Sequence, residues 1–420
     1  MAQTDRHRIV VTGIGVVSPN AIGAGAFDLA CRSGQSGVRP LIGMESANLR
    51  TTAAATVPDF ESISTLNSVD ARRIPRTAAL ALHASRQALA RSGLWIDPDN
   101  LDLQRDIGVV LGTGGGGLAF VEEQYRAYFT EGKGSLFSIT AGTHGNLSSE
   151  LSIALHLRGP SHVISTGCTS STDAIGYSRL MIRARLARAV LCGGADAPVA
   201  PGILTAFEKM RVVSTRRWDR PEQSSRPFDA QRDGFVLGEG AWMFILEDLE
   251  FARARGAEVL AEIAGYGCTC DAYHRVQIAP DVVEPVRAIE KALADAQIAK
   301  EEIGYVNLHG TATELNDRME TAAIRRCFGP LADQIPMSST KSMIGHPQGA
   351  CGAAGIAATI LALRSGQLHP TINLENPDPQ CNLDFIPHRS RPTDAKIALC
   401  NCIAFGSKNS AIVLKVDSPD

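Results

Sequence analysis

The sequence predicts an α/β fold made of two similar halves. Short apolar runs rich in β-branched residues alternate with longer Ala- and Leu-rich stretches of helical period, such as residues 76–91 and 284–296. This alternation is typical of βαβ units, whose sheets are buried on both faces. With 420 residues, the chain is also large for one compact core, which favours two domains or two halves.

The two predicted halves repeat one another in order. Residues 9–15 (IVVTGIG) open the first half, and residues 261–267 (AEIAGYG) open the second. Three further pairs of segments follow in the same order: residues 107–113 and 303–311, residues 163–175 and 336–358, and residues 189–194 and 397–402. We therefore expect one half at residues 1–255 and the other at residues 256–420.

Composition and charge exclude several classes of protein. The 41 Lys and Arg residues against 44 Asp and Glu give a net charge of −3, which argues against non-specific binding to nucleic acid. Residues 1–8 are polar and precede an apolar run too short for a signal segment. The longest run of small apolar residues, 349–363, is shorter than the roughly 20 residues that span a bilayer. We expect a cytoplasmic protein.

Ten cysteines in a chain of this kind are expected to stay reduced. Two pairs, Cys268 with Cys270 and Cys400 with Cys402, have one residue between them, whereas zinc sites typically have two or more. Their strand-like neighbours indicate buried thiols. We expect no metal site.

Cys168 is the candidate nucleophile, in residues 164–171 (ISTGCTSS). Gly167 allows a sharp turn, and the small residues that follow can start a helix. A helix N-terminus stabilises an anion by ~0.3–1 kcal/mol, which would raise the fraction of thiolate. Backbone N–H groups at such a turn can also hold an oxyanion. The alternative is a buried structural cysteine.

Two histidines lie at similar glycine-flanked junctions between strand and helix. His309 follows the strand at residues 305–308, and His346 precedes an Ala- and Gly-rich helix. Their imidazoles can donate hydrogen bonds to a developing enolate or oxyanion. Together with the thiol they predict a covalent acyl-transfer site. Lys341 can tune this site with Glu320 as its counter-ion, or the two can form an ordinary surface salt bridge.

Two glycine-rich runs imitate cofactor-binding motifs. Gly13 and Gly15 begin a motif like the dinucleotide-binding fingerprint, but its third glycine is missing and Pro19 disrupts the start of the helix that should follow. Residues 112–117 resemble a phosphate-binding loop without the Gly-Lys-Ser/Thr ending. We expect close backbone packing at both places and no resident cofactor.

Four motifs together resemble the β-ketoacyl-acyl-carrier-protein synthases of the thiolase-like superfamily, specifically the elongating type II condensing enzymes. They are the Cys168 run, residues 225–235 (SRPFDAQRDGF), residues 309–313 (HGTAT) and residues 339–346 (STKSMIGH). The resemblance covers essentially the whole chain. It implies a five-layered α-β-α-β-α fold, a homodimer, and a ping-pong reaction on substrates carried by the phosphopantetheine of acyl carrier protein.

The resemblance also implies a role for each site residue. Cys168 would accept the acyl group as a thioester, while His309 and His346 would promote decarboxylation of malonyl-carrier and stabilise its enolate. The backbone N–H groups of Cys168 and Phe405 would form the oxyanion hole, with Phe405 also gating the acyl pocket. The remaining matches are Thr311 and Thr313 at the pantetheine arm, Lys341 and Glu320 as a charged support pair, Asp317 as a nearby acid, and Ile403 and Gly115 in the acyl pocket.

The carrier protein is acidic, so an acidic enzyme needs a local basic patch for docking. Arg72, Arg73 and Arg211 match the docking positions of the family, and Arg76 lies close by in the sequence. The alternative is that these are ordinary solvated arginines.

Departures from the pattern of the family lie at the gate and the pocket. Residues 404–409 (AFGSKN) replace Gly-Phe-Gly-Gly-Thr-Asn, so the gate has fewer glycines and carries a cation. Gly115 stands where a larger residue often narrows the acyl channel, which suggests a wider pocket. These changes fit a specialised polyene or polyketide pathway as readily as fatty-acid synthesis.

The main expectation is therefore an acyltransferase that extends a carrier-bound chain by two carbons through decarboxylative Claisen condensation. The paired histidines distinguish the chain from initiating enzymes, and Cys168 distinguishes it from non-catalytic chain-length partners. Two alternatives stay open. One is a subunit of a heterodimer that acts mainly with a chain-length partner, and the other is a thiolase-fold enzyme that transfers or hydrolyses acyl groups without decarboxylation.

Overall fold

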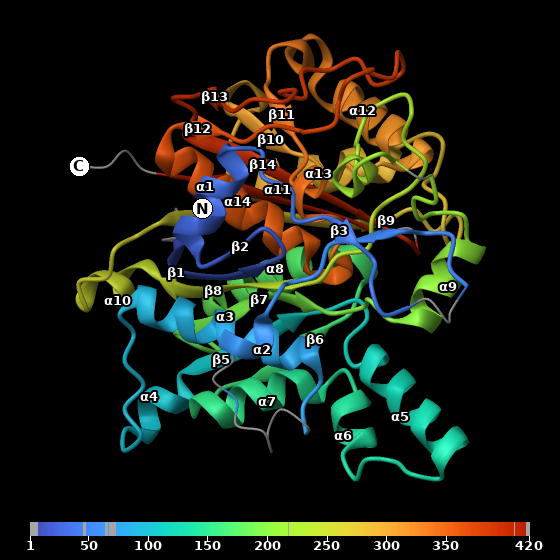
Figure 1. The fold of residues 1–420 in the computed structure, drawn as a ribbon. Helices are drawn as coiled ribbons and strands as arrows, with labels where there is room; N and C mark the ends of the chain where they lie inside the picture. Colours follow the sequence, from blue (N-terminus) through green and yellow to red (C-terminus); the bar gives the residue numbers. More distant parts are fainter. Residues whose placement is uncertain are drawn as a thin grey trace.

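The computed structural model describes residues 7–44, 48–63, 66, 73–216, 218–406 and 408–416. Within this part of the chain, eleven strands form one mixed sheet (Figure 1). The first half contributes β1 (Ile9–Ser18), β2 (Ala21–Ile22), β5 (Ile107–Gly112), β6 (Ser161–Ile164), β7 (Ala189–Asp196) and β8 (Gly240–Asp248). The second half contributes β9 (Ala261–Cys270), β10 (Tyr305–Asn307), β11 (Met337–Ser338), β14 (Ile397–Ala404) and β15 (Lys408–Lys415).

The strand order is the same in both halves. From the centre outward, the first half runs β1-β8-β7-β5-β6 and the second runs β9-β15-β14-β10-β11. In each half the three outermost strands pair in parallel, while the pairs nearer the centre are antiparallel. β1 and β9 join the halves through the pairs Val10–Glu262 and Val11–Ala261. The duplicated architecture is confirmed, and the boundary expected at residues 255 and 256 falls in the turn before β9.

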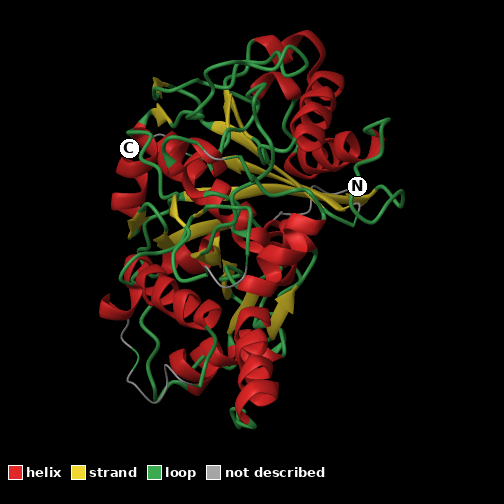
Figure 2. Ribbon diagram, turned by 45° about the vertical axis from the view of Figure 1, so that its right-hand side comes forward, coloured by secondary structure: helices red, strands yellow, loops and turns green. Residues whose placement is uncertain are grey.

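Helices form three layers around these strands, as Figures 1 and 2 show. α8 (Ser170–Arg183) and α14 (Cys351–Ser365) contact each other and strands of both halves, and so form the middle layer. α3 (Arg76–Ser92) and α7 (Asn146–Leu155) cover the first half, and α11 (Val283–Ala296) and α12 (Glu314–Phe328) cover the second. The five-layered α-β-α-β-α fold is therefore confirmed.

Shorter elements surround this framework. The remaining helices are α1 (Ala24–Arg32), α2 (Phe60–Ile63), α4 (Leu101–Arg105), α5 (Leu118–Glu131), α6 (Ser138–Gly142), α9 (Pro201–Lys209), α10 (Leu249–Ala254) and α13 (Lys341–Ile344). Two small antiparallel pairs join β3 (Arg39–Pro40) to β4 (Ala53–Ala54) and β12 (Gln367–Leu368) to β13 (Arg391–Pro392). Among the described helices, none combines the length and apolar character needed to cross a bilayer.

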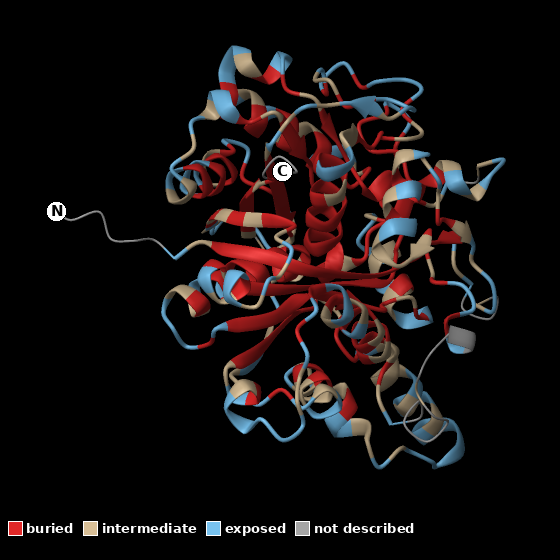
Figure 3. Cartoon of the chain, turned by 90° about the vertical axis from the view of Figure 1, so that its left-hand side faces the viewer, coloured by how far each residue is buried: buried red, intermediate tan, exposed pale blue. Residues whose placement is uncertain are grey.

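The middle layer is held by close backbone approach. A Cβ added at Gly352 of α14 would lie 2.0 Å from Thr172 Oγ1 of α8, and one at Gly355 would lie 2.4 Å from Asn307 Oδ1. The Ala- and Gly-rich composition of α14 therefore lets it lie deep in the core, and Figure 3 shows the central strands and helices buried.

All ten cysteines lie in the described part of the chain and are free thiols. Cys400 and Cys402 are buried, as expected. The expectation for the other pair is wrong, because Cys268 and Cys270 are exposed. They stand at the end of β9, whose last three residues have exposed or half-exposed side chains.

We predict that Gly352→Ala lowers the free energy of unfolding by about 1–3 kcal/mol, because the added methyl group pushes α14 away from Thr172. Gly25→Ala is the matched control, since a Cβ there meets nothing within 4 Å. Denaturant unfolding of both variants measures the difference. Equal stability of the two variants would contradict the close contact between α8 and α14.

Candidate active site

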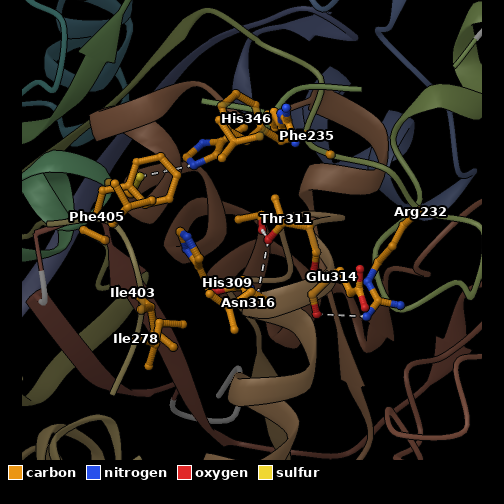
Figure 4. Close-up of a pocket in the computed structure, with 18 of the residues that line it drawn as sticks. Arg232, Phe235, Ile278, His309, Thr311, Glu314, Asn316, His346, Ile403 and Phe405 are labelled. Atoms are coloured by element: carbon orange, nitrogen blue, oxygen red, sulfur yellow. Dashed lines mark hydrogen bonds between the residues drawn. The ribbon is translucent and has the colours of Figure 1, made fainter. Parts of the chain in front are cut away.

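Cys168, His309 and His346 line one cleft with a volume of about 280 Å³. Figure 4 shows the two histidines, Ile403 and Phe405 around the same space. Cys168 comes from the first half, whereas the histidines and the gate come from the second. The fold therefore brings Cys168 together with residues that lie at least 141 positions further along the chain.

Cys168 lies in a single turn of 3-10 helix, Gly167–Thr169, that leads directly into α8. Gly167 has a φ of 72°, which glycine adopts without strain. Ser170 Oγ accepts from Thr166 N and donates to Gly167 O, which holds the turn. The Cys168 Sγ lies 3.2 Å from His346 Nε2, and the backbone N–H of Phe405 is directed at the same sulfur.

Burial dominates the acidity of the predicted nucleophile. It raises the pKa of the Cys168 thiol to about 12, negative charge on Cys351 would act in the same direction, and Lys341 opposes both. The expected gain in thiolate from the helix N-terminus is therefore outweighed. Cys168 is therefore a thiol at neutral pH; to act as a nucleophile it would need a base, and the imidazole of His346 is in contact with its sulfur.

The turn that carries His309 is held by two buried carboxylates of α12. Glu320 accepts from the backbone N–H groups of His309 and Gly310, each at 2.7 Å, and from Asn401 Nδ2 at 2.6 Å. Asp317 accepts from Thr311 N at 3.0 Å. These bonds satisfy donors that burial would otherwise leave unpaired, so the carboxylates fix the position of the ring.

Lys341 begins α13 and holds His309 from another side. Its Nζ donates to His309 O at 2.6 Å and lies 3.3 Å from His309 Nδ1. The expected ion pair with Glu320 is absent from the ion pairs of the described residues, because Glu320 is occupied by the backbone of His309 and Gly310. Lys341 and Glu320 thus both bind the backbone of His309 but form no ion pair with each other.

Both imidazoles are neutral at neutral pH. Burial lowers the pKa of His309 to about 3, with the Lys341 ammonium acting in the same direction, and burial also lowers the pKa of His346. His346 is placed by its backbone, which donates to Val236 O at 2.7 Å, and by Phe235, whose ring lies edge-on at 5.1 Å. The two imidazole centroids are 5.5 Å apart. Each neutral ring carries one N–H donor for a reacting oxygen.

Other predicted site residues fall into two groups. Thr311, Thr313, Ile403 and Phe405 line the cleft, with the two threonine hydroxyls 2.9 Å apart. Among the described residues that line this cleft, Gly115 is absent, because its backbone N–H is held by Asp196 Oδ1 at 2.9 Å in a separate loop.

The predicted docking arginines are not equivalent. Arg211 is exposed and lines the cleft. Arg73 is exposed, and its guanidinium lies 5.5 Å from the centroid of the Phe137 ring. Arg76 forms ion pairs with Glu61 and Glu239 at 2.6 and 2.8 Å, which explains its place in the fold without a partner protein. Arg72 lies outside the described residues.

Two cysteines next to Cys168 were not predicted as site residues. The thiols of Cys351 and Cys402 both donate to the backbone oxygen of Cys168, each at 3.2 Å. The position of Cys402 three residues before Phe405 on the strand that leads to the gate is the signal that could have revealed it. Cys351 has no comparable signal, because its place depends on how α14 packs.

We predict that Cys351→Ala increases the rate at which Cys168 reacts with iodoacetamide at pH 7. The substitution removes a negative neighbour and so lowers the pKa of Cys168. Peptide mass spectrometry follows alkylation of Cys168 itself. Cys400→Ala, a buried cysteine with Thr359 as its partner, is the control, and a rate no faster than in that control would contradict the coupling.

Comparison with known proteins identifies the family. The family described as "Beta-ketoacyl synthase, N-terminal domain" matches residues 6–252, and "Beta-ketoacyl synthase, C-terminal domain" matches residues 260–375. The 3-oxoacyl-[acyl-carrier-protein] synthase 2 of Synechocystis sp. is 38% identical over 99% of both chains. The tetracenomycin polyketide synthase ketoacyl synthase alpha subunit of Streptomyces glaucescens is 38% identical over 99% of this chain and 98% of its own.

A solved structure agrees with these sequence relationships. It is AntDE:AntF, a type II PKS acyl-carrier protein in complex with its ketosynthase bound to the hexaketide. The matching chain has a TM-score of 0.89 and 31% identity, over 99% of this chain and 100% of its own. The fold, the cleft and these relatives agree that the chain belongs to the β-ketoacyl synthase family, among its elongating type II condensing enzymes, and is an acyltransferase.

Proposed function

We propose that this chain lengthens a carrier-bound acyl group by two carbons, with Cys168 as nucleophile and His309 and His346 as hydrogen-bond donors. The observation that carries the proposal is the shared cleft, in which the Cys168 Sγ lies 3.2 Å from His346 Nε2 and both imidazoles are neutral. The pathway is fatty-acid or polyketide biosynthesis, and the change of gate residues supports a specialised product.

The first half-reaction loads Cys168. As the thioester enters, His346 Nε2 accepts the proton of Cys168, and the sulfur attacks the thioester carbonyl. The backbone N–H groups of Cys168 and Phe405 stabilise the oxyanion. The carrier thiolate leaves, takes the proton from His346 and departs as a thiol. The thioester on Cys168 carries no charge, which suits a sulfur whose burial disfavours the thiolate.

The second half-reaction forms the carbon–carbon bond. The neutral ring of His309 donates its N–H group to the thioester oxygen of malonyl-carrier, and His346 does so in the tautomer that carries its proton on Nε2, so carbon dioxide departs and the electron pair is held as an enolate. The enolate carbon attacks the acyl carbonyl and the bond to the Cys168 sulfur breaks, and the departing thiolate takes a proton from solvent, which restores the Cys168 thiol. Lys341 is a positioning residue, because its contact with Nδ1 favours the tautomer that keeps the proton of His309 on Nε2.

We propose acyl carrier protein as the partner and no resident cofactor. Thr311 and Thr313 lie in the cleft, where their hydroxyls can contact the pantetheine arm. Arg211, exposed at this cleft, supplies positive charge toward an acidic carrier. The AntDE:AntF complex supports this assignment. A cytoplasmic location stays a prediction.

We also propose that the chain works as a dimer, either with a second copy or with a partner subunit. The main sheet ends at β6, whose outer side has no neighbouring strand among the described residues. In α5, α6 and the segment between them, Phe129, Leu136 and Ile139 are 81%, 90% and 75% exposed, which is costly for a monomer. Native mass spectrometry of the isolated chain, combined with its activity, separates the two cases, since a subunit that only shapes a partner's pocket does not turn over alone.

Cys168→Ala is expected to abolish condensation and the acyl adduct on the enzyme. The assay supplies acyl-carrier and ¹⁴C-labelled malonyl-carrier, and it measures both the condensed product and labelled carbon dioxide. Mass spectrometry of the wild-type chain after incubation with acyl-carrier is expected to place the adduct on Cys168. Unchanged condensation by Cys168→Ala would overturn the proposal, and wild-type acyl transfer without labelled carbon dioxide would favour a non-decarboxylating enzyme.

Lys341→Met is expected to slow condensation and to move the acid limb of its pH profile to higher pH. The Lys341 ammonium lowers the pKa of His309, so its removal raises that pKa and the ring is protonated at a higher pH. Lys341→Arg, which keeps the charge, is expected to keep the wild-type limb. A slower enzyme with an unmoved acid limb would show that Lys341 acts only through the fold.

A further inference from the structure

We propose that Cys351, Cys402 and His309 form a binding site for a soft or borderline divalent metal ion of the zinc class, immediately behind the nucleophile. The Sγ of Cys402 and the Nζ of Lys341 both lie at the Nδ1 atom of His309, and the Sγ of Cys351 lies beside that of Cys402. The site shares His309 with the proposed condensation but does not need Cys168, which is not one of its ligands.

The spacing of the three ligand atoms is close to that of a metal site. The Sγ atoms of Cys351 and Cys402 are 3.8 Å apart, the Sγ of Cys402 is 3.4 Å from His309 Nδ1, and one ligand atom from each of the three residues lies within 4.8 Å of the others. Two thiolates bound at about 2.3 Å in a tetrahedral arrangement lie about 3.8 Å apart, and a thiolate and an imidazole nitrogen lie about 3.6 Å apart. Small movements of these side chains would therefore bring all three ligand atoms to bonding distance from one metal ion.

Three regular elements place these ligands before any metal binds. Cys351 is the first residue of α14, Cys402 lies in β14, and His309 follows β10 on the turn that Glu320 and Lys341 hold. The three residues are 2–4% exposed. Because a rigid, buried set of ligands loses little freedom on binding, these contacts favour high affinity.

The electrostatics favour a metal that binds with thiolates. A metal dication bound by two thiolates and a neutral imidazole would add no net charge to the core once both thiol protons are released. Lys341 would keep its bond to the backbone oxygen of His309 and give up its contact with Nδ1.

A second set of possible ligands, Cys168, His309 and His346, also lies within 4.8 Å. It offers one sulfur, whereas the first set offers two, and thiolates select for zinc and similar metals. Occupation of the two-thiol site would take His309 Nδ1 from Lys341 and disturb the thiols that hold the Cys168 carbonyl. Metal binding is therefore expected to inhibit condensation.

The test uses Co²⁺ as a spectroscopic probe of the whole chain, in the Cys168→Ala background. We expect visible bands of tetrahedral Co²⁺ together with thiolate-to-cobalt charge transfer, at one ion per chain, and displacement by Zn²⁺. Cys402→Ser and, separately, Cys351→Ala are expected to lose these bands. Cys400→Ser is the matched control and is expected to keep them, because Cys400 is buried on the same strand with Thr359 as its partner.

Either of two results would overturn the proposal. One is the absence of tetrahedral Co²⁺ bands in a folded Cys168→Ala chain, and the other is their persistence in both Cys402→Ser and Cys351→Ala. Bands in the wild-type chain that disappear in Cys168→Ala or His346→Ala would assign the metal to the other set of ligands and so would also overturn it. Because the Cys168→Ala background performs no proposed condensation, failure of this test leaves the catalytic proposal untouched.

Discussion

The close approach of α8 and α14 is the constraint on which the site depends. Gly352 brings the backbone of α14 against Thr172 of α8, so the first turns of both helices meet in the middle layer. Cys168 lies just before α8, and Cys351 is the first residue of α14. A side chain at position 352 would separate the two helices, and with them the thiol of one half from the histidines of the other.

Burial then decides the chemistry of the groups that this packing assembles. In this buried site the neutral forms of Cys168, His309 and His346 are favoured, so the resting enzyme holds a thiol and two imidazoles with no charge on any of them. Charge is created only when a substrate arrives, next to N–H groups that are already in place. This arrangement suits a reaction whose intermediates are an oxyanion and an enolate.

Two further cysteines, Cys351 and Cys402, shape the surroundings of Cys168. Cys351 and Cys402 support the carbonyl of Cys168 and influence its acidity, while they also stand at metal-ligand distances from His309. The same buried sulfurs can thus position the nucleophile and make the site sensitive to thiophilic metals. Lys341 stands at the point where the two roles meet, since its ammonium contacts His309 Nδ1, the atom that a metal ion would take from it.

The sequence by itself determined the duplicated α/β architecture and the identity of Cys168, His309 and His346 as site candidates, because strand periodicity, glycine-flanked turns and family motifs are local features of the chain. Only the tertiary structure decided how these residues interact. At Cys168, burial in the core raises the pKa of the thiol by more than the helix N-terminus lowers it. The Glu320 carboxylate, which was expected to pair with Lys341, instead accepts a hydrogen bond from the backbone N–H of His309. Cys351 reaches the site through helix packing, which no pattern near position 351 encodes.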